Sequence, residues 1–415
     1  MKRILACVLC FSILCGCSAA SGSNAAPENK LVLACWQATR VAPMVELYNS
    51  LHPEMPIEIK EYYNPNIDVN QALTQMNAEL VAGDQVDLYC FGSLDLQRLI
   101  NSEMVADLIP FVESDQTFND ENYYMDILEM FQINGKLYEM PCFLQLAGIC
   151  LPDNLVPDGM TGWTIQEYID FDAALQDENK TVLSMEPETL LSFMAQYAID
   201  TFISEDRSSC DFDNEAFYEL LNFVKDDANG NGGTPVGMGT WVMGVLTYIS
   251  DIDRLKTQAK YVGYPDAERN GPCVMSLVSY GISSTTEHPD ECWDFIKLTL
   301  SDEAYLNAGI DDAFPLSRSA LEQGISAFQL STGNENSPLY GLTDMDGEYY
   351  VPLDAEYVPY IYELLDSVTH ARFRYSGVYT IINEEGSAFL ENDKSAEETA
   401  KLIQNRVSIF LSEQQ

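Results

Sequence analysis

The stretch LVLACWQATRVAPMVELYNSLHPEMPIEIKEYY, residues 31–63, decides the fold class. It begins with a continuous apolar run over residues 31–36, which predicts a buried strand. Residues 43–51 carry apolar side chains at the spacing of one helix face, and residues 56–63 alternate as a half-buried strand does. These segments therefore predict a strand, a helix and a second strand in succession.

The alternation of strands and helices continues along the chain. Residues 69–81 have helical spacing and stop near Gly83, and residues 86–91 form a third apolar run. The order β-α-β-α-β predicts a parallel sheet covered by helices, because parallel strands need a crossover between them. A second α/β segment follows, with strands predicted at residues 146–151 and 261–264.

Local signals mark further element boundaries. Residues 135–141 (GKLYEMP) predict a short hairpin that leads into the strand at 146–151. Thr164 with Glu167, and Ser395 with Glu398, have the spacing of capping boxes at helix starts. The last of these helices carries an apolar stripe, made of Ala396, Ala400, Ile403, Val407 and Phe410.

The N-terminus is typical of an exported protein. Lys2 and Arg3 precede an apolar run over residues 4–14, which is too short to span a membrane. The run ends in Leu14-Cys15-Gly16-Cys17, which resembles a bacterial lipobox. The resemblance implies a signal peptide over residues 1–16 and lipidation of Cys17. An ordinary signal peptide cleaved elsewhere, without lipid, is the alternative.

Residues 17–29 are small and polar, which predicts a flexible tether that holds a domain near a membrane. The remaining length, about 400 residues, and a hydrophobic content of 47% predict a globular protein with two lobes. The formal net charge of −44 repels nucleic acid and anionic lipid headgroups, so neither is an expected partner. It also disfavours an anionic ligand unless a local basic pocket exists.

Metal and disulfide frameworks are not expected. Seven cysteines follow Cys17, they form no C-x-x-C pair, and several lie in apolar runs, which favours free buried thiols. The three histidines are far apart in sequence. Residues 227–232 resemble the start of a calcium loop, but Met238 stands where a bidentate Glu is needed. We therefore predict no metal and no cofactor.

Several short motifs, in their order along the chain, resemble the extracellular solute-binding lipoproteins of bacterial ABC importers, in particular the maltodextrin-binding-like sugar binders of family 1. The motifs are residues 80–88 (LVAGDQVDL), 107–111 (DLIPF), 135–141 (GKLYEMP), 162–164 (GWT), 262–265 (VGYP), 280–283 (YGIS), 292–297 (CWDFIK) and 395–413. Two positions depart from the pattern: Val86 replaces a usual proline, and Tyr379 stands where many relatives carry a tryptophan.

The resemblance implies an α/β fold of the two-lobe, periplasmic-binding-protein-like type II. Each lobe would be a mostly parallel sheet flanked by helices, with hinge crossovers near Pro141, Gly263 and Pro315. The lobe limits that it implies are residues 30–141 plus 265–314 for the N-lobe and residues 142–264 plus 315–415 for the C-lobe.

A sugar site needs aromatic platforms and polar groups, and ligands of open α/β sheets lie beyond the carboxyl ends of strands. Side chains of these kinds directly follow the first and third predicted strands, and they are candidate ligand contacts: Trp36, Gln37, Arg40, Phe91, Ser93 and Asp95. Trp36 as a core residue and Asp95 as a plain helix cap are the alternatives.

Further candidate contacts follow from the resemblance. Gln145 lies just past the first crossover, and Tyr264 and Tyr280 flank the second. Trp241 follows a Gly-rich turn at a stacking position of the family, and Tyr379 would replace the tryptophan of the C-lobe. Trp163 and Trp293, near helix starts with apolar neighbours, are assigned to packing instead.

The function that the resemblance implies is capture of a carbohydrate by closure of the lobes and delivery to a membrane permease. The protein would be a monomer at the outer face of a bacterial membrane, attached only through its lipid. We expect no enzyme, because the nucleophile-elbow, Walker and H-E-x-x-H motifs are absent. Alternatives are a peptide or amino-acid ligand, for which Arg40, Arg372 or Arg374 would supply a cation, a lipid-anchored hydrolase, and a surface adhesion lipoprotein.

Overall fold

The computed structural model describes residues 29–82, 85–92, 94, 96–176, 178–204, 208–228, 233–242, 244–255, 259–266, 268–308, 313–343, 347–372, 376–391 and 394–414. Cys17, Ser93, Asp95 and the calcium-like residues 229–232 lie outside this part. Among the helices in it, none combines the length and apolarity needed to cross a membrane.

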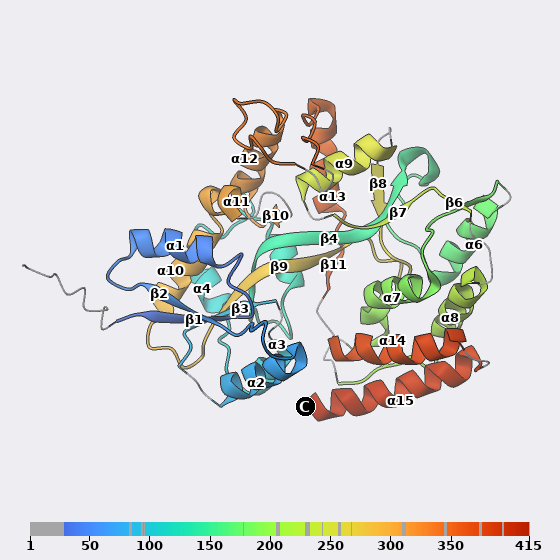
Figure 1. Cartoon of the computed structure of the whole chain (residues 1–415), viewed down its shortest axis with the longest axis horizontal. Coiled ribbons are helices and arrows are strands. Elements are labelled where there is room, and N and C mark those ends of the chain that lie inside the picture. The colour runs from blue at the N-terminus through green and yellow to red at the C-terminus, as the bar shows by residue number, and fades with distance from the viewer. Residues whose placement is uncertain are drawn as a thin grey trace, which may run out of the picture.

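A mixed sheet of nine strands, counted over the described ranges, runs through the molecule (Figure 1). Its path is β10-β4-β9-β3-β1-β2, with β11 paired to β9 and with β7 and β8 paired to β4. The strands are β1 Leu31–Cys35, β2 Ile57–Glu61, β3 Leu88–Phe91, β4 Met140–Pro152, β7 Met238–Val242, β8 Ala259–Val262, β9 Cys273–Ile282, β10 Phe314–Pro315 and β11 His370–Ala371. A separate small sheet pairs β5 (Lys180–Thr181) with β6 (Thr234–Pro235).

The first three strands pair as predicted. β1 is parallel to β2, with Leu31 opposite Ile57, and parallel to β3, with Leu33 opposite Leu88. Leu31 and Leu33 pack on the face covered by α1 (Ala42–Leu51) and α10 (Pro289–Thr299). Ala34 packs on the other face, against α2 (Val69–Val81) and α3 (Leu96–Asn101). The apolar run of the first strand is therefore buried on both faces.

Two long strands join the halves of the molecule. β4 is antiparallel to β9, β7, β8 and β10, and β9 is also antiparallel to β3. The expectation of mostly parallel sheets therefore holds for β1, β2 and β3, for the β11–β9 pair and for the small β5–β6 sheet, but not for the pairs made by β4. The reason is that the chain crosses the middle of the molecule in one direction along β4 and returns along β9.

Five helices, counted over the described ranges, enclose one of the main cores. They are α6 (Ile165–Gln176), α7 (Pro187–Ala198), α8 (Glu215–Ala228), α14 (Ser376–Glu391) and α15 (Ala396–Gln414), which lie together in Figure 1. The other main core lies under the N-lobe helices α1 and α10 and also includes residues of α4 (Ile109–Ser114), α5 (Met125–Met130), α9 (Val245–Leu255), α11 (Asp302–Ala308), α12 (Arg318–Phe328) and α13 (Val358–Asp366). Short 3-10 turns cover Asp153–Leu155, Ile199–Phe202 and Ala355–Tyr357. The two-lobe α/β fold is confirmed, whereas its residue limits stay a prediction.

The predicted local signals are confirmed. The Glu167 amide donates to Thr164 Oγ1 at 3.1 Å and the Thr164 amide donates to Glu167 Oε2 at 2.9 Å, which is a capping box at α6. Ser395 and Glu398 make the same reciprocal pair at α15. The hairpin before β4 turns at Asn134 and Gly135, both with positive φ, where glycine is favoured.

The two tryptophans that were assigned to packing are buried. Trp163 donates its indole N–H to the carbonyl of Gly263 at 2.8 Å. Trp293 packs between the rings of Phe111 and Phe118. The seven cysteines after Cys17 are free, and all except Cys210 are buried, which confirms the prediction of free thiols.

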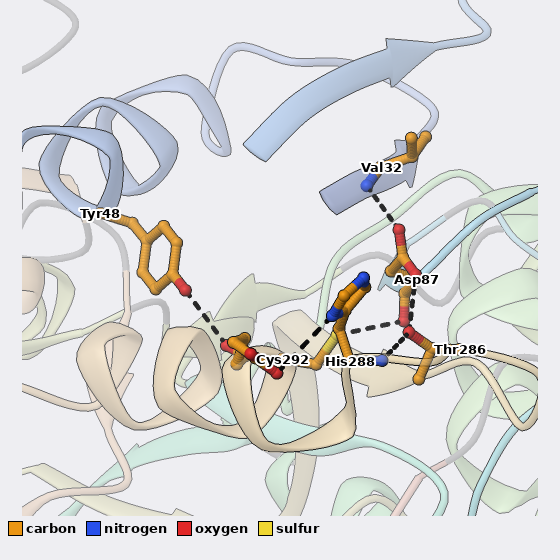
Figure 2. Close-up of polar contacts among 7 residues, drawn as sticks. Val32, Tyr48, Asp87, Thr286, His288 and Cys292 are labelled. Atoms are coloured by element: carbon orange, nitrogen blue, oxygen red, sulfur yellow. Dashed lines mark hydrogen bonds and ion pairs between the residues drawn. The ribbon is translucent and has the colours of Figure 1, made fainter. Parts of the chain in front are cut away.

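Asp87, the acidic residue of the motif at residues 80–88, holds the N-lobe together (Figure 2). One carboxylate oxygen accepts from the amide of Val32 in β1 at 2.8 Å, and the other accepts from Thr286 Oγ1 at 2.6 Å. The Asp87 carbonyl accepts from the amide of Ser283 at 2.9 Å. Asp87 thus ties β1 and the start of β3 to the loop between β9 and α10.

Candidate functional site

The residues after β1 lie at the edge of the N-lobe. Trp36 is half-buried, and its ring meets the ring of Tyr63 edge-on at a centroid distance of 5.7 Å. Gln37 is exposed and Arg40 is half-buried. Trp36 lies at the rim of the cluster around Tyr89 and Phe91, so this end of β1 offers an aromatic ring with polar neighbours.

Phe91 and Tyr280 lie deeper than the residues after β1. The Phe91 ring stacks on Tyr89, and Gly281 packs against it. Tyr280 is fully buried, with its ring edge-on to Phe295 at 5.1 Å. In this conformation both aromatic rings belong to the core, and their contact with a ligand stays a prediction.

Glu139 is a buried carboxylate that the sequence analysis did not select. Its side chain is 7% exposed and accepts a hydrogen bond from the hydroxyl of Ser279. Ser279 lies opposite Pro141 in the β4–β9 pair. The signal was present, because Glu139 lies inside the GKLYEMP motif, but acids are too common in this chain to stand out.

The most concentrated polar and aromatic group lies in the C-lobe around Arg372, directly after β11. Arg372 Nε and Nη2 donate to the hydroxyl of Tyr379 at 3.1 and 2.6 Å, and Nη1 contacts Met275 Sδ at 2.8 Å. The guanidinium also lies over the rings of Tyr197 and Tyr379, at 4.8 and 5.1 Å from their centroids. Cation–π contacts of this kind hold the guanidinium plane in place.

Tyr264 extends this group. Its ring stacks on Tyr197 at a centroid distance of 4.2 Å and an interplanar angle of 14°. Phe193 of α7 lies beside both tyrosine rings. Desolvation raises the pKa of both tyrosines well above the usual value, so both hydroxyls stay protonated near neutral pH.

Strand register places Gln145 on the same side of the sheet as Met275, which contacts Arg372. Gln145 of β4 lies opposite Met275 of β9, and the amide of Arg372 donates to the carbonyl of Val274 at 2.7 Å. Facing residues of an antiparallel pair share one face of the sheet, so Gln145 and Met275 point to the same side. Along β9, Met275 and Ser279 are about 13 Å apart at the usual rise per residue. The Arg372 group and the Ser279–Glu139 pair therefore lie at separate points along β9.

Trp241 and Tyr379, two of the candidate contacts in the C-lobe, lie on β7 and α14. Trp241 lies in β7 opposite Ala147 of β4, and Tyr379 lies in the first turn of α14. One helical turn beyond Tyr379, a groove of about 290 Å³ runs between α7 and α14. Its walls carry hydroxyl, amide, carboxylate and aromatic groups, among them Glu188, Ser192, Phe193, Asn383 and Ser387.

A family model for bacterial extracellular solute-binding proteins matches residues 44–326, which is more than half of the chain. The chain belongs to this family. As an extracellular solute-binding protein it is a binder rather than an enzyme, which agrees with the expectation drawn from its motifs. No curated protein sequence matches this solute-binding protein.

Solved structures of the same fold cover nearly the whole solute-binding protein. The sugar-binding protein MalE from Xanthomonas citri has a TM-score of 0.61 and is 12% identical, over 93% of this chain and 98% of that chain. An ABC substrate-binding protein from Listeria monocytogenes, in complex with cycloalternan, has a TM-score of 0.55 and is 13% identical, over 92% and 98%. The GacH receptor of Streptomyces glaucescens, solved unliganded and with acarbose, has a TM-score of 0.54 and is 11% identical, over 92% and 98%. At sequence identities of 11–13%, the structural likeness establishes the fold alone.

Within that fold, the structure of the solute-binding protein brings some predicted residues together and separates others. Tyr379 contacts Arg372 directly, and Tyr264 stacks on Tyr197 beneath it. Gln145 lies opposite Met275, which also contacts Arg372. Sequence reasoning named Arg372 only as a cation for a peptide ligand and did not name Tyr197 or Met275. No sequence signal distinguishes these two residues, because β9 and α7 carry them as ordinary members of apolar patterns.

Proposed function

We propose that the protein binds a carbohydrate between its lobes and delivers it to the permease of an ABC importer. The observation that carries this proposal is the grouping of Tyr197, Tyr264 and Tyr379 with polar partners on one side of β4 and β9. Stacked aromatic rings beside hydrogen-bonding groups are what the CH faces and hydroxyls of a sugar need. The solved structures of similar fold, one described as a sugar-binding protein and others with cycloalternan or acarbose, support the ligand class.

The ligand would contact both lobes. On the N-lobe we propose Trp36, Gln37 and Arg40, with Phe91, Ser93 and Asp95 at the end of β3. On the C-lobe we propose the contacts Gln145, Trp241, Tyr264 and Tyr379, with Tyr280 on the strand between the lobes. The proposed lobes are residues 30–141 plus 265–314 and residues 142–264 plus 315–415.

Closure of the lobes would trap the sugar. α15 of the C-lobe contacts α3 of the N-lobe, and both lie on the side of β4 and β9 away from α9 and α12 (Figure 1). The lobes therefore meet on that side in this conformation. A ligand drives closure only if it binds the closed state more tightly than the open one, so we propose that its contacts are completed when the lobes meet.

We further propose that Cys17 carries the lipid that anchors the protein, as a monomer, at the outer face of a bacterial cell membrane. Residues 17–29 would be the tether, after removal of residues 1–16. The lipobox-like sequence Leu14-Cys15-Gly16-Cys17 supports this proposal. A diacylated anchor with a polar tether holds a domain at the membrane surface without inserting it.

The test is thermal unfolding of the purified protein against mono- and oligosaccharides, with amino acids and peptides alongside. A ligand at 100 times its dissociation constant adds about 2.7 kcal/mol to the free energy of unfolding, which raises the melting temperature measurably. We expect one class of sugar to produce a dose-dependent rise, and Trp241→Ala to abolish it. A rise with amino acids or peptides alone would replace the carbohydrate assignment, and Arg372 would then supply the cation for the carboxylate of a peptide.

A further inference from the structure

Arg372 is a buried guanidinium in a strongly acidic protein. Its side chain is 6% exposed, and it is the one basic residue among the buried polar and charged residues of the described ranges. No acidic side chain within those ranges forms an ion pair with it, although the sequence contains 65 acids. A buried charge without a counter-charge costs free energy, so its retention in the core calls for an explanation.

The partners of Arg372 are all neutral. The Nε and Nη2 edge, which matches a carboxylate in bidentate geometry, meets the single hydroxyl oxygen of Tyr379. Nη1 meets the thioether of Met275, which is a weak acceptor. With its amide oxygen facing the guanidinium, Gln196 accepts from Nη1 and Nη2 at 3.1 and 3.2 Å. The group is thus rich in donors and holds no anion.

Two more donors belong to the neighbouring rings, namely Tyr197, over which the guanidinium lies, and Tyr264, which stacks on Tyr197. The hydroxyls of Tyr197 and Tyr264 are buried; that of Tyr264 meets no hydrogen-bond partner among the described residues, and that of Tyr197 has only the side chain of Gln196 beside it. An unsatisfied buried hydroxyl is itself costly, so the Tyr264 hydroxyl, on a ring that stacks on Tyr197, marks a place for an acceptor.

We propose that the cargo is an acidic carbohydrate, whose carboxylate binds Arg372 and the hydroxyls of Tyr197 and Tyr264. This inference rests on the proposed carbohydrate-binding function and names the subclass of sugar. Met275, Gln196 and Tyr379 are half-buried and cover Arg372, so the carboxylate approaches through them. Met275 is unbranched and adopts other rotamers easily, which lets it move aside.

The same group disfavours a free amino acid. The ammonium of an amino acid is one carbon away from its carboxylate and would lie beside the Arg372 guanidinium. Among the described residues, no carboxylate forms an ion pair with this guanidinium that could be shared with the ammonium. A uronic acid brings the carboxylate without the ammonium.

The test is titration calorimetry of the purified protein with uronic acid disaccharides and with the neutral hexose disaccharides of the same linkage. We expect the acidic sugar to bind at least about 10-fold more tightly than its neutral counterpart. Arg372→Gln should weaken the acidic sugar by at least about 30-fold and the neutral one by much less, because only the acidic sugar loses one partner of a buried charge pair. Arg406→Gln, which removes a C-lobe arginine that pairs with Glu384 and Glu385 at the surface, is the matched control.

A second variant keeps the test decisive if Arg372→Gln does not fold. Tyr264→Phe removes a hydroxyl that has no partner in the unliganded protein, so it should fold with equal or higher stability. It should nevertheless weaken the acidic sugar by about 10-fold, because a hydrogen bond to a charged group is lost. Lower stability with unchanged affinity would overturn the inference.

The outcomes separate the two proposals. Tighter binding of the uronate that depends on Arg372 supports both. Binding of neutral sugars alone, unchanged in Arg372→Gln, overturns the acidic cargo and leaves the carbohydrate function standing. Binding of peptides but of no sugar overturns the carbohydrate function, and with it the inference.

Discussion

Replacement of Asp87 by alanine tests the assignment of the 80–88 motif to structure. The carboxylate accepts from the amide of Val32 at 2.8 Å and from Thr286 Oγ1 at 2.6 Å (Figure 2). A hydrogen bond to a charged group contributes about 1.5–3 kcal/mol to the free energy of unfolding. Because Asp87 is half-buried, we place each of its two bonds near the lower end of this range. The expected loss for Asp87→Ala is therefore about 3 kcal/mol of the free energy of unfolding.

Urea unfolding measures this loss, with the slope of the transition expected to stay unchanged because the buried surface is the same. Thr286→Val removes one of the two bonds and should cost about half as much. Since the two changes share one bond, a double-mutant cycle should give a coupling energy of about 1 kcal/mol. If Asp87→Ala unfolds within about 0.5 kcal/mol of the wild type, the network does not hold the N-lobe and the reasoning is refuted.

Three further changes test separate parts of the account. Gly281→Ala places a Cβ 2.7 Å from the ring of Phe91 and should cost about 1–3 kcal/mol in urea unfolding, whereas a neutral effect would contradict the close packing. Burial lowers the pKa of His370 below its usual value of 6.5, although nearby acids oppose this effect. The unfolded chain therefore binds the proton more tightly than the folded protein, so stability falls as the pH drops below about 6.5. His370→Gln should lose less stability than the wild type between pH 7 and pH 5, and equal losses would count against this cause. Cys17→Ser should abolish labelling by a tagged fatty acid and release the protein from membranes, and continued labelling would exclude this anchor.

Much of the fold follows from local patterns. The run at residues 31–36 and the alternation at residues 56–63 became β1 and β2, because each segment buries its apolar side chains in the way its period requires. The capping pairs at Thr164 and Ser395 became helix starts, since they satisfy backbone amides regardless of the rest of the fold. Strand direction was not predictable for β4 and β9, because an apolar run has the same pattern in a parallel and an antiparallel sheet.

The site was less predictable than the fold. An aromatic residue at a strand end has the same sequence signature whether it packs, as Tyr280 does, or lies at a rim, as Trp36 does. Tyr197 and Met275 join the Arg372 group only through the register of β9 with β11 and the position of α7. Long-range contacts of this kind produce no regular residue spacing in the sequence, so only the folded chain brings these residues together.

The most direct test of carbohydrate capture is a crystal structure of the protein with the sugar that raises its unfolding temperature most. The account predicts the sugar between the lobes, in contact with the C-lobe group at Tyr264 and Tyr379 and with N-lobe residues at the end of β1. A sugar bound on the outer surface of one lobe, with no contact to the other, would contradict capture by closure.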